Sequence, residues 1–246
     1  MGALDGKKAL VTGGSRGIGR AIVHRLARDG ASVVFSYLTN TPAAEEVVKS
    51  ACGSPGQVQS FQADQGQRDD IELLFEETDR RLNGLDILVI NAATFGQAGI
   101  VDVKKSDFNR VMAVNIEGPF IALQLAGRIM RDNGRIINIS TITTTRSSPN
   151  WGLYTASKAF CEQIMSVAAQ EFGHRDITVN SVSPGPTETD ALYEEQEPKT
   201  INSFVGATAL RRLGRPSDIA NVVAYLAGSD AQWITGQNIR ATGGLL

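Results

Sequence analysis

The chain has 246 residues, of which 42% are hydrophobic, and this size favours one large α/β domain with a sizeable core. Its formal net charge of -2 excludes the strong positive field with which proteins attract nucleic acid or an anionic membrane. The two cysteines and two histidines have no metal-ligand spacing, and no apolar run has the length of a membrane span or a signal segment. We therefore expect a cytoplasmic protein with no metal, no nucleic-acid partner and no membrane association.

Apolar runs of strand length alternate with helical patterns along the chain. The predicted strands are 9–11, 32–37, 58–62, 87–90, 135–139, 178–182 and 237–240. The predicted helices lie near 18–29, 42–51, 68–82, 104–114, 115–132, 152–172 and 216–227. This alternation predicts βαβ units, and hence a parallel sheet with helices on both faces, in a single domain over residues 1–246.

One segment, residues 186–210, follows neither pattern. It contains five acidic residues and Pro198, with few positions of core type. Two interpretations stay open, a lid over a ligand and a disordered loop.

A glycine-rich loop, residues 13–19, follows the first predicted strand and opens the first predicted helix. Glycines allow a tight turn and a close approach of the backbone to a diphosphate, which binds at a helix N-terminus. An ordinary turn between strand and helix is the alternative. The position between a strand and a helix favours a dinucleotide.

Tyr154 and Lys158 are four residues apart in a predicted helix and therefore share one face of it. A phenol has an ordinary pKa near ~10, and a neighbouring ammonium lowers that value. A general acid works best when its pKa lies near the working pH. The pair therefore predicts a proton-transfer site, whereas the alternative is an ordinary solvated helix face.

These features occur together with further motifs in a fixed order along residues 7–244. They are Ala63-Asp64, Leu88–Ala92, Val114-Asn115, Gly134–Ser140, Val179-Asn180, Pro184–Thr187, Arg212–Pro216, Ile234–Gln237 and Gly243-Gly244. With this set the chain resembles the short-chain dehydrogenase/reductase family, in the branch that includes 3-oxoacyl-carrier-protein reductases and glucose dehydrogenases. The resemblance implies a Rossmann-like, doubly wound, seven-stranded parallel sheet, with the cofactor across the carboxyl ends of the strands.

The resemblance also implies a catalytic group of Asn115, Thr141, Tyr154 and Lys158. Tyr154 would deliver a proton to the substrate carbonyl, while Lys158 lowers its pKa and bonds the cofactor ribose. Asn115 would hold a water that links Lys158 to solvent. Thr141 stands thirteen residues before the tyrosine, where the family has serine, and would bond the substrate oxygen. Thr143 is a less favoured replacement for that serine.

The cofactor implied by the resemblance is NADP(H). Arg16 lies inside the glycine loop, where NADPH-using members carry a basic residue, and residues 36–39 lack the acid that bonds the ribose of NAD. Asp64 would bond the adenine amino group, unless it caps the following helix. The full set of expected cofactor residues is Gly13, Ser15, Arg16, Gly17, Ile18, Gly19, Ser36, Asp64, Gln65, Asn91, Ala92, Ala93, Tyr154, Lys158, Pro184, Gly185 and Thr187.

Two departures from the family pattern concern the cofactor side. Ile90 replaces an asparagine that ties neighbouring strands, and Ala93 replaces a glycine with greater backbone freedom. Both changes are expected to affect how tightly the cofactor binds more than which cofactor binds.

The expected activity is NADPH-dependent reduction of a ketone or 3-keto group to a secondary alcohol. The alternatives are an NAD(P)-dependent alcohol or sugar dehydrogenase and a low-activity, cofactor-binding regulatory protein. Thr143, Trp151 and Tyr154 are the expected substrate contacts, and for Trp151 plain packing is the alternative. Of two basic positions for docking a carrier protein, Arg175 fits and Asp132 has the wrong sign, which favours a small free carbonyl substrate. The family resemblance implies a homotetramer or a homodimer.

Overall fold

A computed structural model describes residues 2–245, in which seven strands form one sheet in the order β3-β2-β1-β4-β5-β6-β7. All neighbouring strands are parallel. After β3 the chain returns to the opposite side of β1, which confirms the predicted doubly wound, Rossmann-like sheet. The strands are β1 Lys8–Val11, β2 Ser32–Tyr37, β3 Val58–Gln62, β4 Leu85–Ile90, β5 Met130–Ile139, β6 Thr178–Pro184 and β7 Asn238–Ala241.

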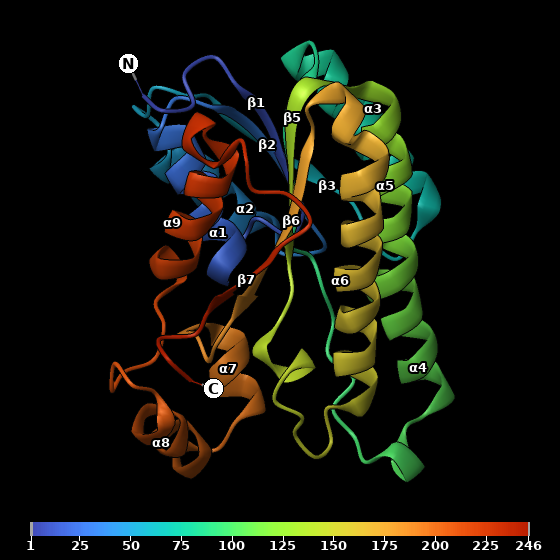
Figure 1. The fold of residues 1–246 in the computed structure, drawn as a ribbon, viewed down its shortest axis with the longest axis vertical. Coiled ribbons are helices and arrows are strands. Elements are labelled where there is room, and N and C mark those ends of the chain that lie inside the picture. Colours follow the sequence, from blue (N-terminus) through green and yellow to red (C-terminus); the bar gives the residue numbers. More distant parts are fainter. Residues whose placement is uncertain (1, 246) are drawn as a thin grey trace.

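Helices cover both faces of the sheet (Figure 1). α1, α2 and α9 lie on one face, α3, α5 and α6 lie on the other, and α7 and α8 lie beyond the carboxyl ends of the strands. The α-helices are α1 Gly17–Arg28, α2 Thr41–Ser50, α3 Arg68–Leu82, α4 Lys105–Met112, α5 Gly118–Ile129, α6 Gly152–Phe172, α7 Asp190–Glu195, α8 Pro198–Ala207 and α9 Pro216–Ala227.

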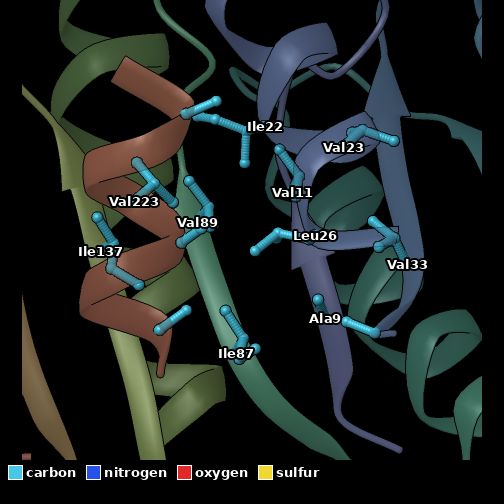
Figure 2. Close-up of a cluster of buried hydrophobic side chains, with 14 of the residues drawn as sticks. Ala9, Val11, Ile22, Val23, Leu26, Val33, Ile87, Val89, Ile137 and Val223 are labelled. Atoms are coloured by element: carbon cyan, nitrogen blue, oxygen red, sulfur yellow. The ribbon is translucent and has the colours of Figure 1, made fainter. Parts of the chain in front are cut away.

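The central strands bury side chains on both faces, as parallel strands in such sheets do. Val11 and Val89 face α1 and α9, where they pack in one cluster with Leu26 and Val223 (Figure 2). Leu88, whose side chain alternates to the other face, packs in a second cluster with α3, α5 and α6. Burial of each such side chain contributes roughly 1.5–3 kcal/mol, so the two clusters hold the strand ends in a fixed arrangement.

The predicted boundaries were wrong near residue 115 and near residue 132. α4 and α5 are joined without a break by the π-helical turn Ala113–Glu117, so no helix boundary falls at residue 115. Such turns are frequent at functional sites. The helix after it ends at Ile129 because Met130 is already extended and pairs with Leu85 at the start of β5.

The segment 186–210 forms α7 and α8, so the interpretation as a disordered loop was wrong. Thr189 caps α7 through a 3.3 Å contact of its hydroxyl with the Leu192 amide, and Pro198 occupies the first turn of α8, where proline is well tolerated. Every residue of both helices is at least partly exposed. Hydrophobic periodicity therefore could not predict them.

Candidate active site

A cleft of about 570 Å³ opens at the carboxyl ends of the strands. It includes the turn after β1 and the end of β4, where the strand order reverses and where ligands bind in open α/β sheets. Every predicted site residue except Asn115 lines this cleft. These residues are Gly13, Ser15, Arg16, Gly17, Ile18, Gly19, Ser36, Asp64, Gln65, Asn91, Ala92, Ala93, Thr141, Thr143, Trp151, Tyr154, Lys158, Pro184, Gly185 and Thr187.

The glycine loop is held from below by Ser36, at the end of β2. The Ser36 hydroxyl accepts a hydrogen bond from the Gly13 amide at 3.1 Å, and its carbonyl accepts one from the Gly14 amide at 2.8 Å. Gly13 has a φ of +69°, in the left-handed region that favours glycine. A Cβ on Gly19 would lie 2.1 Å from the Gly13 carbonyl oxygen, so the loop closes onto the helix only because Gly19 has no side chain. This cradle suits a diphosphate.

Asn91 ties the end of β4 to the glycine loop. Its amide nitrogen Nδ2 donates to the carbonyl oxygens of Thr12 and Gly13, each at 3.0 Å. The strand tie expected to be lost with Ile90 is therefore made by the next residue, while Ile90 itself packs in the core. Ala93 is not among the residues with positive φ, so a glycine is not required there.

Asp64 is held in place by protein groups at the expected adenine end of the cleft. Its carboxylate accepts hydrogen bonds from Arg110 at 2.9 Å and from the Gly66 amide at 2.8 Å. Burial opposes ionisation, but these two hydrogen bonds hold the pKa of Asp64 below its ordinary value. The residue that caps α3 is Gln67, so the interpretation of Asp64 as a helix cap was wrong.

Gln65 beside it supports the fit of a polar ligand. Its side chain is buried, and within residues 2–245 its Nε2 atom has no hydrogen-bond partner. A buried amide without a partner is costly, which a hydrogen-bonding ligand in the cleft would relieve.

Arg16 is exposed at the mouth of the cleft and faces α7. Its guanidinium lies 3.6 Å from the carboxylate of Glu194 in α7. Both side chains are exposed, so this pair contributes little to stability and leaves Arg16 accessible to an anion. Glu194 was not predicted to contact the loop, because no sequence pattern relates the two positions.

Tyr154 and Lys158 lie one turn apart on α6 and are both buried at the base of the cleft. The Lys158 ammonium donates to the Ile139 carbonyl oxygen at 2.8 Å and lies 5.9 Å from the centre of the Tyr154 ring. Burial raises the pKa of Tyr154 far above its ordinary value, and a hydrogen bond with Thr141 opposes part of this rise. Lys158 was expected to lower that pKa, but here Thr141 does so.

Thr141 is at the end of a chain of hydroxyl groups. Its oxygen accepts from the Thr143 amide at 3.2 Å and from the Thr143 hydroxyl at 3.3 Å, and the Thr155 hydroxyl donates to Thr143 at 3.0 Å. Thr141 is the hydroxyl that lowers the pKa of Tyr154, and the Thr143 hydroxyl in turn donates to Thr141.

Asn115 lies behind the cleft, in the π-helical turn, with 1% of its surface exposed. Its Nδ2 donates to the Thr94 carbonyl oxygen at 2.8 Å and to the Ser157 hydroxyl at 3.0 Å, and its Oδ1 accepts from the Thr94 amide. Its own carbonyl oxygen accepts from the Cys161 thiol. The side chain thus fastens the π-helical turn to α6 and to the segment after β4.

Three aromatic rings form one wall on the substrate side. The Phe95 ring centre lies 5.7 Å from that of Trp151 and 5.1 Å from that of Tyr154, and the Trp151 and Tyr154 centres are 5.5 Å apart. Leu192 of α7 and Phe204 of α8 also line the cleft. Phe95 was missed in the sequence, because nothing in the spacing brings it next to Trp151.

Charged side chains of both signs line the cleft, and the basic ones include Arg16, Arg110 and Arg146. Asp190 and Glu195 of α7 line the cleft. Arg175, the one basic residue that fitted carrier docking, is paired with Asp132 at 2.8 Å. Among the described residues there is no helix with the length and apolarity of a membrane span, and no cluster of three potential metal ligands.

Fold and site together define an oxidoreductase of the dinucleotide-binding class. The family model described as enoyl-(acyl carrier protein) reductase matches residues 13–246. The chain is 38% identical to an uncharacterised oxidoreductase of Methylorubrum extorquens, over 100% of both proteins. It is 36% identical to the NADPH-dependent aldehyde reductase 2 of Arabidopsis thaliana, over 99% of this chain and 95% of that protein.

A solved structure gives the same result. The angucycline C-6 ketoreductase LanV, with bound NADP, is 42% identical, covers 100% of this chain and 97% of its own, and superposes with a TM-score of 0.94. The chain belongs to the short-chain dehydrogenase/reductase family.

Proposed function

We propose that the protein is an NADPH-dependent reductase that converts a ketone into a secondary alcohol. The observation that carries the proposal is the buried Tyr154 phenol, which lines one cleft together with Thr141, Lys158 and the glycine loop. The names of two relatives, an NADPH-dependent aldehyde reductase and a ketoreductase solved with NADP, support the same chemistry.

In this reaction NADPH, when bound, supplies the hydride that adds to the carbonyl carbon. Tyr154, which burial keeps protonated, gives its proton to the carbonyl oxygen as negative charge develops there. Thr141 holds the same oxygen by a hydrogen bond and so places it against the phenol. The Lys158 ammonium, close to the ring, stabilises the phenolate that remains.

Arg16 is proposed to recognise the 2′-phosphate of NADPH, because Ser36, Tyr37 and Leu38 present no acid at the end of β2. Replacement of Arg16 by Ala would remove a hydrogen bond to a charged group, which contributes about 1.5–3 kcal/mol, or roughly 10- to 100-fold in affinity. The affinity for NADPH should fall by that factor, and the affinity for NADH should stay unchanged. Arg20→Ala, at an exposed arginine in the helix that follows Arg16, is the matched control.

The substrate is proposed to be a small, uncharged aryl ketone. Phe95 and Trp151 offer a flat aromatic wall next to the phenol, and aromatic pairs contribute about 0.5–1.5 kcal/mol beyond burial. The basic residue that suits carrier docking, Arg175, is paired with Asp132, which disfavours an acyl-carrier protein. Trp151→Leu keeps an apolar side chain, so it should lower kcat/KM for a bicyclic aryl ketone more than for a small aliphatic ketone.

A homotetramer is proposed as the assembly. Exposed apolar side chains occur on helices of both faces of the sheet, Phe120 and Val167 on α5 and α6, and Tyr225 and Trp233 at α9 and the segment after it. Exposed apolar side chains on both faces suit an assembly with two kinds of interface. Light scattering coupled to gel filtration measures the mass directly.

The proposed function is tested by mixing the protein with NADPH and a panel of ketones and following the loss of NADPH absorbance. Turnover well above that of Tyr154→Phe is expected. A wild type no faster than this variant contradicts the enzyme proposal, and turnover with NADH alone contradicts the choice of cofactor.

A further inference from the structure

A carboxylate that the mechanism does not use is hydrogen-bonded to the two residues that flank the Thr141 segment, Ser140 and Thr144. Glu162 is half-buried on α6, one turn after Lys158 and two turns after Tyr154. Its Oε1 atom accepts hydrogen bonds from the hydroxyls of Ser140 and Thr144, the latter at 2.8 Å. One carboxylate oxygen thus accepts hydrogen bonds from Ser140, directly after β5, and from Thr144 in the turn that follows.

A third hydroxyl, from Ser183 of β6, lies 3.4 Å from the same carboxylate oxygen. Ser183 also donates to Asn238 at the shorter distance of 2.8 Å, so its single proton goes mainly to β7. The two strong contacts to Glu162 are therefore those of Ser140 and Thr144.

These two contacts bracket Thr141 in the chain. Ser140 precedes it directly, and the Thr144 hydroxyl also lies 3.0 Å from the Thr141 carbonyl oxygen. Glu162 thereby fastens the segment that carries Thr141 to the helix that carries Tyr154. The separation between the two reacting hydroxyls depends on this attachment, and a displacement of about 1 Å can cost 10²-fold in rate.

Glu162 also places a negative charge near the buried Lys158. Burial lowers the pKa of Lys158, whereas Cys161 and Glu162 oppose part of that shift. Burial raises the pKa of Cys161 to about 11, so this thiol is neutral at working pH and Glu162 supplies the anion. Tyr154 is the other titratable group beside the ammonium, and the Ile139 carbonyl faces it from β5.

We propose that Glu162 is a positioning residue of the reductase, which fixes the Thr141 hydroxyl against Tyr154 and keeps Lys158 charged. The proposal rests on the proposed function. It assigns to Glu162 two separable effects, one on geometry through Ser140 and Thr144 and one on charge.

Three variants separate these effects. Glu162→Gln keeps an oxygen acceptor and nearly the same size but removes the charge. Thr144→Val removes one anchoring hydroxyl but keeps the charge. Glu171→Gln, at an exposed position of the same helix, is the matched control. For each variant we would measure the melting temperature, NADPH affinity, and kcat and KM for the best ketone across pH.

In Glu162→Gln the Lys158 ammonium loses its neighbouring anion and gives up its proton at lower pH. The alkaline limb of the kcat profile should therefore move to lower pH. Thr144→Val should lower kcat by about tenfold, as a small misplacement predicts, and leave the position of that limb unchanged. Both variants should bind NADPH and melt close to the wild type, and Glu171→Gln should match the wild type throughout.

The outcomes separate the two proposals. A wild type no faster than Tyr154→Phe overturns the function and the role of Glu162 together. An active wild type whose pH profile and kcat persist in Glu162→Gln and Thr144→Val overturns the role of Glu162 alone. Losses of kcat that occur only together with a lower melting temperature also overturn it, because they show that Glu162 contributes to stability and does not position Thr141.

Discussion

Replacement of Thr141 by Val removes the hydroxyl next to the Tyr154 phenol, the proposed proton donor, and keeps the shape of the side chain. Two consequences follow from the structure. The Thr143 amide loses its acceptor at 3.2 Å, and Tyr154 loses the hydrogen bond that lowers its pKa. Thr143 is half-buried, so water replaces part of the lost contact and the destabilisation should be about 1 kcal/mol. For a domain of this size that lowers the melting temperature by roughly 2–4 °C.

The catalytic loss should be much larger than the loss of stability. A single hydrogen-bond donor to a developing oxyanion contributes about 10²–10³ in kcat, or roughly 2.7–4 kcal/mol. Thr141→Val should therefore lower kcat by that factor, while the affinity for NADPH remains unchanged. Thr141→Ser keeps the hydroxyl and should retain kcat within a few-fold.

The assay follows NADPH loss at saturating ketone, with the melting temperature measured on the same preparations. A Thr141→Val enzyme with wild-type kcat would falsify the assignment of this hydroxyl. Loss of activity in the valine variant with full activity in Thr143→Val supports it, and the reverse pattern shows that Thr143 is the working hydroxyl.

Three further predictions concern the scaffold. Gly19→Ala should abolish folding or lower the melting temperature strongly, because a Cβ at this position would lie 2.1 Å from a backbone oxygen. The control Gly173→Ala, where a Cβ would have no atom within 4 Å, should show a normal thermal melt. Burial raises the pKa of Cys161 to about 11, so at neutral pH iodoacetamide should modify only the exposed Cys52, as mass spectrometry can show. A hydrogen bond from an arginine lowers the pKa of Asp218 in the folded state. The stabilising effect of the ionised carboxylate is therefore present above the ordinary carboxyl pKa and is lost as pH falls through the lowered pKa of the folded state. In urea unfolding, the stability of Asp218→Asn should depend less on acid pH than that of the wild type.

The sheet could be predicted because its signals are local. Apolar runs such as 87–90 and the helical face with Ile22 and Leu26 follow directly from periodicity, and both are buried as expected. The glycine loop could be predicted for the same reason, since its glycines are adjacent and its strand and helix flank it. Parallel topology then brings residues 13–19, 91 and 184 to one end of the sheet without any further information.

The contacts that tune the site could not be predicted, because each joins residues that are distant in sequence. Glu162 reaches Ser140 and Thr144 across about twenty positions, and a half-buried glutamate on a helix has no distinguishing pattern. Phe95 belongs to the site only through the way the segment after β4 folds over α6. Helices α7 and α8 carry too few core-type positions for periodicity to act, so only caps such as Thr189 mark them.

The largest difference between expectation and structure concerns the sign of the shift at Tyr154, and it bears on the direction of the reaction. A phenol made acidic by an ammonium would rest partly as phenolate, the form needed to take a proton from an alcohol. In the structure burial dominates, so the phenol stays protonated at neutral pH. A site that holds its proton before the carbonyl arrives is ready for reduction, and oxidation requires prior loss of that proton. For the proposed reductase, this protonated resting state suits proton donation to the carbonyl oxygen, with Thr141 and the cation of Lys158 next to the phenol when charge develops.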